Sequence, residues 1–281
     1  MGHDESCGDN LGSDRSSCMR TEMGPTTIST GKTSGSVIAK GGQQLSTLEE
    51  WHSYAPPKGR THWKDGRSAK ENARLWLEAA PDFPSGVAEV LGACGSVGNI
   101  RSWSAEPEAR VKFDEFPGEP ANLDVLVKAE DEKGPVVIGV EAKADEAFGS
   151  TVERTLSQAQ KRLRQNSRSK GVERIGQLAH LFALDLDRRE ILDLRYQLLT
   201  LTAATIAEAD RQSAQRAIVI VQEFVSSFTT AERRAVNARD LEAFLVTVFG
   251  HTGSIGSGTI AGPFRMGGIG ALYFGKTETV I

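Results

Sequence analysis

One apolar run in the C-terminal half constrains the fold more than any other feature. Residues 216–224 read RAIVIVQEF and are dominated by β-branched and other apolar side chains. A strand with one solvent-exposed face alternates apolar and polar residues, whereas a strand buried on both faces has a continuous apolar sequence. The sequence therefore predicts a buried strand in a sheet with a packed layer on each side.

Three shorter strand-like runs come earlier in the chain. They are ARVKF at 109–113, LDVLVKA at 123–129 and PVVIGVEAKA at 135–144. The last two are joined by EDEKG, a five-residue link with a glycine that indicates a hairpin. Before them, SAKENARLWLEAA at 68–80 places apolar residues at helical spacing and predicts a helix.

Helices are expected after the hairpin as well. Ser150 with Glu153, and Thr229 with Glu232, have the spacing of capping boxes, which mark helix starts. Helical periodicity over about 175–209 predicts a helical insertion before the buried strand. The predicted order is helix, three strands, helix, helical insertion, strand and helix, which indicates an α/β fold with a mixed central sheet.

The two ends of the chain differ from its centre. Residues 1–44 are rich in Gly, Ser, Thr and Asp with little apolar clustering, so we expect a disordered polar leader. Residues 45–281 are expected to form a single domain. Within it, the glycine-rich stretch 250–270 predicts a loop, closed by an edge strand ALYFGK at 271–276.

Composition excludes several classes of protein. No window reaches the roughly 18 apolar residues that a membrane span needs, and the first residues lack a secretory signal, so we expect a cytoplasmic protein without a membrane partner. Three widely spaced cysteines, Cys7, Cys18 and Cys94, do not suggest a disulfide framework. The five histidines never approach one another at zinc-ligand spacing.

Charge is distributed unevenly along the chain. The formal net charge of −4 argues against a dedicated nucleic-acid binder. However, residues 58–74 hold six basic and two acidic side chains, and residues 150–174 hold seven and two. Between them, residues 119–146 hold eight acidic side chains and three lysines. This layout favours a divalent cation among carboxylates with a polyanion held nearby, although a solvated surface is the alternative.

The candidate chemistry lies on the predicted hairpin. Alternate side chains of a strand share a face, so Glu141 and Lys143 point the same way and Asp124 can meet them from the preceding strand. A salt bridge between Lys143 and one acid is the simple explanation, but it leaves one carboxylate over. A Mg²⁺ or Mn²⁺ ion held by Asp124, Glu141 and the Ala142 carbonyl would neutralise the surplus and leave Lys143 to position a water.

This arrangement resembles the PD-(D/E)XK nuclease superfamily, whose restriction-endonuclease-like core has the order αβββαβ. The resemblance covers about residues 66–225. It matches Asp124 to the motif aspartate, Glu141 to the acid of the second motif and Lys143 to its lysine, with Ala142 as the variable position between them. The residue before the aspartate is Leu123 where the family name has proline.

The resemblance also assigns Glu71 to the acid often found on the first core helix. Glu71 lies three residues after Ser68 and could equally be a capping-box acid. As a whole the resemblance implies a Mg²⁺-dependent nuclease that hydrolyses phosphodiester bonds, in DNA in preference to RNA. The alternative is a catalytically inactive nuclease-fold module that binds nucleic acid or protein, in which Lys143 only bridges Glu141. A homodimer is left open.

Basic side chains supply candidate contacts to a nucleic-acid backbone. The residues expected to bind phosphates are Arg154, Lys161, Arg168, Lys64 and Arg67. The first three recur every seven residues and so would share one helical face, for which a solvated face is again the alternative. Tyr196 and Gln197, in the predicted insertion, are expected to have packing and surface roles.

Overall fold

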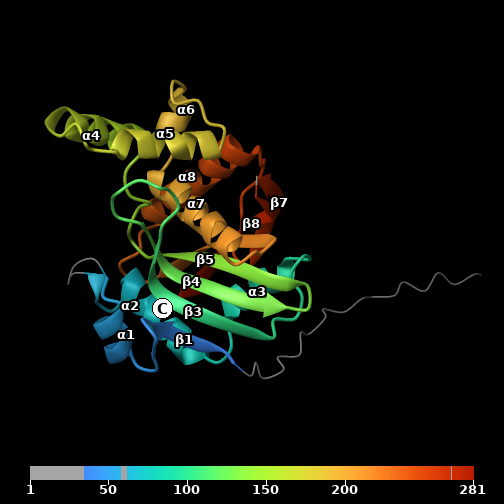
Figure 1. The fold of residues 1–281 in the computed structure, drawn as a ribbon. Coiled ribbons are helices and arrows are strands. Elements are labelled where there is room, and N and C mark those ends of the chain that lie inside the picture. Colours follow the sequence, from blue (N-terminus) through green and yellow to red (C-terminus); the bar gives the residue numbers. More distant parts are fainter. Residues whose placement is uncertain (1–34, 58–61, 267) are drawn as a thin grey trace, which may run out of the picture.

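A computed structural model of the chain describes residues 35–57, 62–266 and 268–281. In these ranges it contains eight helices and eight strands, and all strands belong to one mixed sheet (Figure 1). The strands are β1 (Val37–Lys40), β2 (Gln43–Gln44), β3 (Ser102–Val111), β4 (Ala121–Asp131), β5 (Gly134–Lys143), β6 (Arg216–Val225), β7 (Thr259–Met266) and β8 (Ile269–Val280). The helices are α1 (Leu48–Tyr54), α2 (Ser68–Ala79), α3 (Ser85–Ala93), α4 (Val152–Gln165), α5 (Gly171–Leu181), α6 (Arg189–Leu192), α7 (Tyr196–Arg211) and α8 (Ala231–Phe249). The predicted α/β class is confirmed. Across the described ranges, no helix is long and apolar enough to span a bilayer.

The sheet has the strand order β2-β1-β3-β4-β5-β6-β8-β7. Strands β3, β4 and β5 form an antiparallel meander, and β5, β6 and β8 run parallel to one another. The predicted hairpin between β4 and β5 is confirmed, with a tighter turn than expected, because Asp131 already pairs with Gly134. The helical insertion is also confirmed and runs from α5 to α7, slightly longer than predicted.

Helices cover both faces of the sheet. Helices α4 to α8 lie on one side, which is the upper side in Figure 1, and α1 and α2 lie on the other. Helix α3 joins α1 and α2, because its buried residues pack in the same core cluster as Trp76. The residues of β6 alternate between the two cores: Val219 packs toward α7 and α8, and Ile218 packs toward α2 and α3. The prediction of a strand covered on both faces is therefore confirmed.

A buried ion pair ties the turn end of the hairpin to β6. The Arg216 guanidinium meets both oxygens of Asp131, at 2.5 and 2.7 Å, and the Asp131 side chain has no exposed surface. The same carboxylate accepts hydrogen bonds from the backbone N–H groups of Gly98 and Lys133. These bonds satisfy a charge that would otherwise be costly to bury, and they hold β4, β5 and β6 together at this end of the sheet.

Helix α7 approaches β5 more closely than a side chain would allow. A Cβ atom on Gly139 would lie 2.1 Å from Oγ1 of Thr205 on α7, well inside van der Waals contact. Glycine is thus required at this point of β5 by packing. The close approach matters because Gly139 is two residues before Glu141 on the same face.

Both chain ends differ from the sequence prediction. Strands β1 and β2 lie inside segment 1–44, for which no order is expected; residues 1–34 of that segment are outside the described ranges. With only Ile38 buried, the short β1 has little apolar pattern to detect. The predicted loop at 250–270 is wrong in its second half, which forms β7, and β8 is an interior strand between β6 and β7, not an edge.

The predicted helix caps are shifted by one residue. The cap of α4 is Thr151, whose hydroxyl accepts the Arg154 N–H, and the cap of α8 is Thr230. Ser150 is engaged elsewhere, because its carbonyl accepts the N–H of Tyr196. Helix α4 ends at Gln165, so Arg168 lies beyond it and does not continue the basic face predicted for this helix.

Candidate functional site

Strands β4 and β5 separate at the end opposite their turn. The last paired residues of their ladder are Val125 and Val140, while β5 continues for three more residues along β6. Beyond the last pair, Oδ2 of Asp124 accepts the backbone N–H of Ala142 at 2.7 Å. The N–H and C=O of one residue in a strand face the same neighbour, so the Ala142 carbonyl also faces the side on which Asp124 lies.

Glu141 and Lys143 form a buried pair beside this point. Lys143 Nζ lies 2.6 Å from Oε1 of Glu141, and the two residues are only 6% and 2% exposed. The ammonium also lies 5.3 Å from the centre of the Phe148 ring, at which distance a cation is attracted by an aromatic face. The structure thus brings together the three side chains that the sequence places on one face.

A fourth side chain reaches the same carboxylate from the helical insertion. Nε2 of Gln197, in the first turn of α7, donates to Oε1 of Glu141 at 2.6 Å. The surface role expected for Gln197 is wrong, since this bond places it at the site. No spacing rule could have found the contact, because Gln197 lies 56 residues from Glu141 in the sequence.

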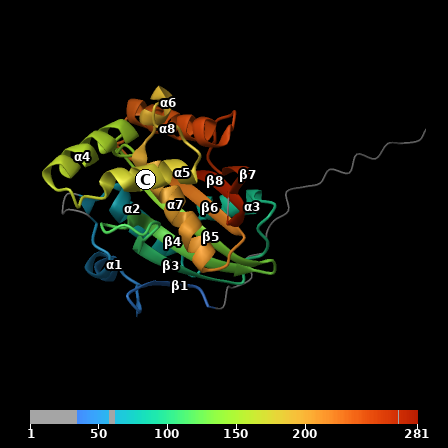
Figure 2. The ribbon, with the colours of Figure 1, turned by 45° about the horizontal axis from the view of Figure 1, so that its top comes forward.

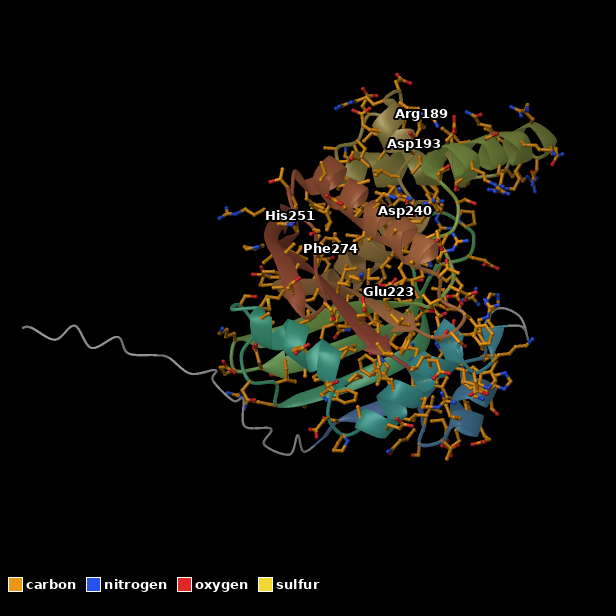
Figure 3. All side chains as sticks on the ribbon, turned by 180° about the vertical axis from the view of Figure 1, so that it is seen from behind. Arg189, Asp193, Glu223, Asp240, His251 and Phe274 are labelled. Atoms are coloured by element: carbon orange, nitrogen blue, oxygen red, sulfur yellow. The ribbon has the colours of Figure 1, made fainter. Side chains whose placement is uncertain are left out.

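Hydrogen bonds attach the start of α7 to the chain leaving β5. The N–H of Val152 donates to Leu194, and the N–H of Tyr196 donates to Ser150. Arg195, the N-cap residue of α7, donates to the Gly149 carbonyl and to Asp240, which is labelled on α8 in Figure 3. These bonds, together with the close contact at Gly139, fix where the first turn of α7 meets β5.

The electrostatics of the site oppose the ionisation of both acids. Asp124 is partly buried. Burial, and then the neighbouring Glu141 carboxylate, raise the pKa of Asp124 well above its ordinary value. Burial lowers the pKa of Lys143, but Glu141 and Asp124 outweigh this effect and the pKa is raised. Lys143 is therefore a charged donor, and with both acids ionised the three groups carry one net negative charge.

The donor set fits a hard divalent cation. Among the described side chains, neither Oδ1 of Asp124 nor Oε2 of Glu141 accepts a hydrogen bond, and carboxylate and carbonyl oxygens are the ligands that Mg²⁺ and Mn²⁺ prefer. The observation that favours a cation is that Asp124, beside a second carboxylate, has a raised pKa and has Oδ1 without a hydrogen bond among the described residues. In the part of the chain that the structure describes, no three His, Cys, Asp or Glu side chains form a metal-binding group. An ion here would therefore have two carboxylates and the Ala142 carbonyl as its protein ligands.

Glu71 is not brought to this site. It is buried on α2, where Oε1 accepts the N–H of Gly66 and Oε2 pairs with Arg74. Helix α2 packs against the sheet face opposite to α7. The expected capping box is also absent, because α2 has no side-chain cap and the Ser68 hydroxyl donates to Glu146 instead. Glu71 thus anchors the chain entering α2.

The structure separates the five basic residues expected to bind phosphates: Arg168 lies beyond the end of α4, and the other four form two pairs. Arg154 and Lys161 are exposed and seven residues apart on α4, so they share a face. Arg67 lies at the start of α2 and is paired with Asp145 at 2.6 Å, just beyond β5, while Lys64 is exposed nearby. Lys58 and Arg60, which contribute to the basic run at 58–74, lie outside the described residues.

Comparison with known proteins places the chain in a family. Residues 44–280 match the model of a domain of unknown function, DUF6946. The chain belongs to this family. No curated protein and no solved structure matches it. The DUF6946 match covers every element from α1 to β8 and so includes the complete site.

Proposed function

We propose that this DUF6946 protein is a Mg²⁺-dependent nuclease that hydrolyses phosphodiester bonds, in DNA in preference to RNA. The observation that carries the proposal is the convergence of Asp124, Glu141 and Lys143 where β4 and β5 separate. Two acids and one ammonium that meet here, with Glu141 and Lys143 almost fully buried, are costly to the fold unless a ligand uses them.

The order of elements supports the same proposal. Helices α2 and α3 precede the meander β3-β4-β5, further helices follow, and β6 then joins β5 in parallel. This order is similar to the αβββαβ order of the PD-(D/E)XK superfamily that the sequence resembles, if α5 to α7 are taken as an insertion. In that superfamily the matching acids hold the metal and the matching lysine acts on the attacking water. Fold order alone never assigns a reaction, so the proposal depends on the side chains.

Each side chain has a role that follows from its surroundings. Asp124 and Glu141 would hold the ion with the Ala142 carbonyl. A bound Mg²⁺ supplies a more acidic water and charge stabilisation for the phosphate. Lys143 remains charged, so it donates hydrogen bonds and orients water or a phosphate oxygen, and does not accept a proton. Gln197 fixes Oε1 of Glu141, which leaves Oε2 for the ion.

A second candidate function rests on the short contact between Lys143 and Glu141. At 2.6 Å and nearly complete burial, this pair is a stable internal salt bridge. A nuclease-fold module that binds nucleic acid or protein without cleaving would need nothing more from these residues. The two candidates differ in what they expect of Asp124, because only the nuclease uses its free oxygen.

Cation binding and cleavage together test the proposal. We expect wild-type protein to bind Mn²⁺ in a calorimetric titration and to cleave plasmid or single-stranded DNA when Mg²⁺ or Mn²⁺ is present. Asp124→Asn keeps an acceptor for the Ala142 N–H but removes the charge, and should lose both activities. Glu130→Gln, on the exposed surface of the same strand, is the matched control and should retain both. If wild-type protein neither binds Mn²⁺ nor cleaves DNA, the nuclease proposal is rejected and the non-cleaving binding module remains.

The role of Lys143 has its own test. Lys143→Met keeps the length of the side chain but removes the ammonium, so the site gains one net negative charge. We expect cleavage to be abolished while DNA binding persists and the affinity for Mn²⁺ rises. Cleavage at the wild-type rate in this variant would remove Lys143 from the mechanism, and a parallel loss of DNA binding would make its role structural.

A further inference from the structure

A cavity of about 650 Å³ lies at the turn between α4 and α5. One wall is the end of α4 and the start of α5, and the other is the loop Pro117–Glu119, which leads into β4. Figures 1 and 2 show α4 and α5 next to each other in the helical layer. Most of the residues that line the cavity are exposed, so a partner can reach it from solvent.

The lining of this cavity is strongly basic. It includes four cationic side chains and one acidic residue, namely Arg162, Arg168, Lys170, Arg174 and Glu119. Arg174 is held rigidly: it pairs with the buried Asp114, donates to the Glu119 carbonyl at 2.7 Å, and lies 4.8 Å from the centre of the Phe113 ring. Lys170 pairs with exposed Glu173 at 2.9 Å. Arg174 thus forms a fixed wall of the cavity.

The remaining two arginines have no such neutralising contacts. Among the described residues, neither Arg162 nor Arg168 has an acidic group within ion-pair distance, although both line the cavity and both are exposed. Nη2 of Arg162 lies 3.6 Å from where a Cβ on Gly171 would be, so its guanidinium leans over the start of α5. An arginine fork matches phosphate geometry with two parallel hydrogen bonds. The chemistry of the cavity is that of a phosphate site.

The cavity is connected to the candidate catalytic site through two consecutive residues. Tyr196 lies close enough to Arg174 and Arg162 for their charges to oppose the rise in its pKa that burial causes. The next residue, Gln197, donates to Glu141. The arginines of the cavity thus influence Tyr196, and the proposed reacting centre contacts Gln197, its neighbour in the first turn of α7.

We propose that this cavity holds a backbone phosphate of the bound nucleic-acid strand, away from the phosphate that is cleaved. The inference rests on the proposed function for the nature of the ligand. The inference adds Arg162 as a phosphate contact. It also places Arg168 in the cavity, whereas the sequence predicts it on the basic face of α4. It also accounts for how an acidic protein could bind a polyanion: the basic groups are concentrated in one place.

Binding without cleavage isolates the cavity. Fluorescence anisotropy of a labelled DNA oligonucleotide is measured in chelator across a salt series, for wild type and for Arg162→Gln combined with Arg168→Gln. Neutralising one phosphate contact should weaken binding about tenfold and reduce the slope of log K against log salt by about 0.9 for duplex. The matched control is Arg233→Gln combined with Arg239→Gln, two exposed residues of α8 with the same charge change, and it should bind as wild type does.

The outcomes separate this inference from the proposed function. Equal weakening in both double variants, or none in either, would overturn the cavity assignment. Cleavage of DNA by wild type in Mn²⁺ with unchanged binding by the cavity variant would retain the nuclease and reject the cavity. DNA binding that depends on the cavity, without any cleavage, would retain the cavity as a phosphate site and reject the nuclease. Complete displacement of DNA by millimolar inorganic phosphate at equal ionic strength would assign the cavity to a free anion and also overturn the proposal.

Discussion

The ion pair between Asp131 and Arg216 makes a quantitative prediction about stability and pH. Burial raises the pKa of Asp131, but the bonds from Arg216 and from two backbone N–H groups outweigh it and hold the pKa at about 2, against an ordinary value of 3.8. A depressed pKa means that the unfolded chain binds the proton more tightly than the folded protein does. The pair therefore stabilises the fold above pH 4, and this contribution is lost as the pH falls toward 2.

The magnitude follows from the size of the shift. A difference of nearly two pKa units corresponds to roughly 2 kcal/mol of unfolding free energy. The Asp131 side chain has no exposed surface, but solvent still screens the pair, so this figure is an upper value. Asp131→Asn also leaves the Arg216 guanidinium buried without its counterion, for which losses of about 3–5 kcal/mol are usual. At pH 7 we therefore expect Asp131→Asn to lower the unfolding free energy by about 3–5 kcal/mol.

Urea unfolding at several pH values measures both quantities. The difference in unfolding free energy between wild type and Asp131→Asn should be largest above pH 5 and should shrink by roughly 2 kcal/mol on lowering the pH to 2. Glu130→Gln, at the exposed neighbouring position, should stay within about 0.5 kcal/mol of wild type throughout. A difference between wild type and Asp131→Asn that does not change between pH 6 and pH 2 would refute the reasoning.

Three further predictions concern the site. Burial and Glu141 raise the pKa of Asp124, so the folded protein holds the carboxyl proton of Asp124 more tightly than the unfolded chain does. The contribution of Asp124 to stability therefore falls as the pH rises. In chelator, Asp124→Asn should resist urea better than wild type at pH 7 and no better than wild type at pH 3. Gly139→Ala should lower the unfolding free energy by about 1–3 kcal/mol, because its methyl group collides with Thr205, and unchanged denaturation would reject the close contact. Gln197→Leu should reduce cleavage while leaving urea stability within about 1.5 kcal/mol; full activity would show that Glu141 does not need this donor.

The central strands could be predicted because their signal is local. In β6 every residue from Arg216 to Phe224 is buried, so composition alone identifies it. The N-terminal β1 has one buried residue, and β7 contains Gly262 and Pro263 within eight residues, so neither has a readable pattern. The prediction failed where a strand owes its existence to its neighbour in the sheet.

The site could be predicted only in part, for the same reason. The common orientation of Glu141 and Lys143 follows from the two-residue period of a strand, and the hairpin brings Asp124 to them. The orientation of Glu71 depends on which sheet face α2 covers, and the contact of Gln197 depends on how α7 is tied down. Both are consequences of tertiary packing, which one sequence does not reveal through spacing.

The ties between α7 and the end of β5 have a consequence for any shortened version of this protein. A fragment without residues 171–211 would keep all eight strands, yet it would expose the apolar surface of β5 around Gly139 and remove the amide donor of Glu141. The smallest unit that carries an intact site is thus larger than the core fold itself. A version of this protein reduced to its sheet and the remaining helices is expected to be insoluble or to lack an intact site.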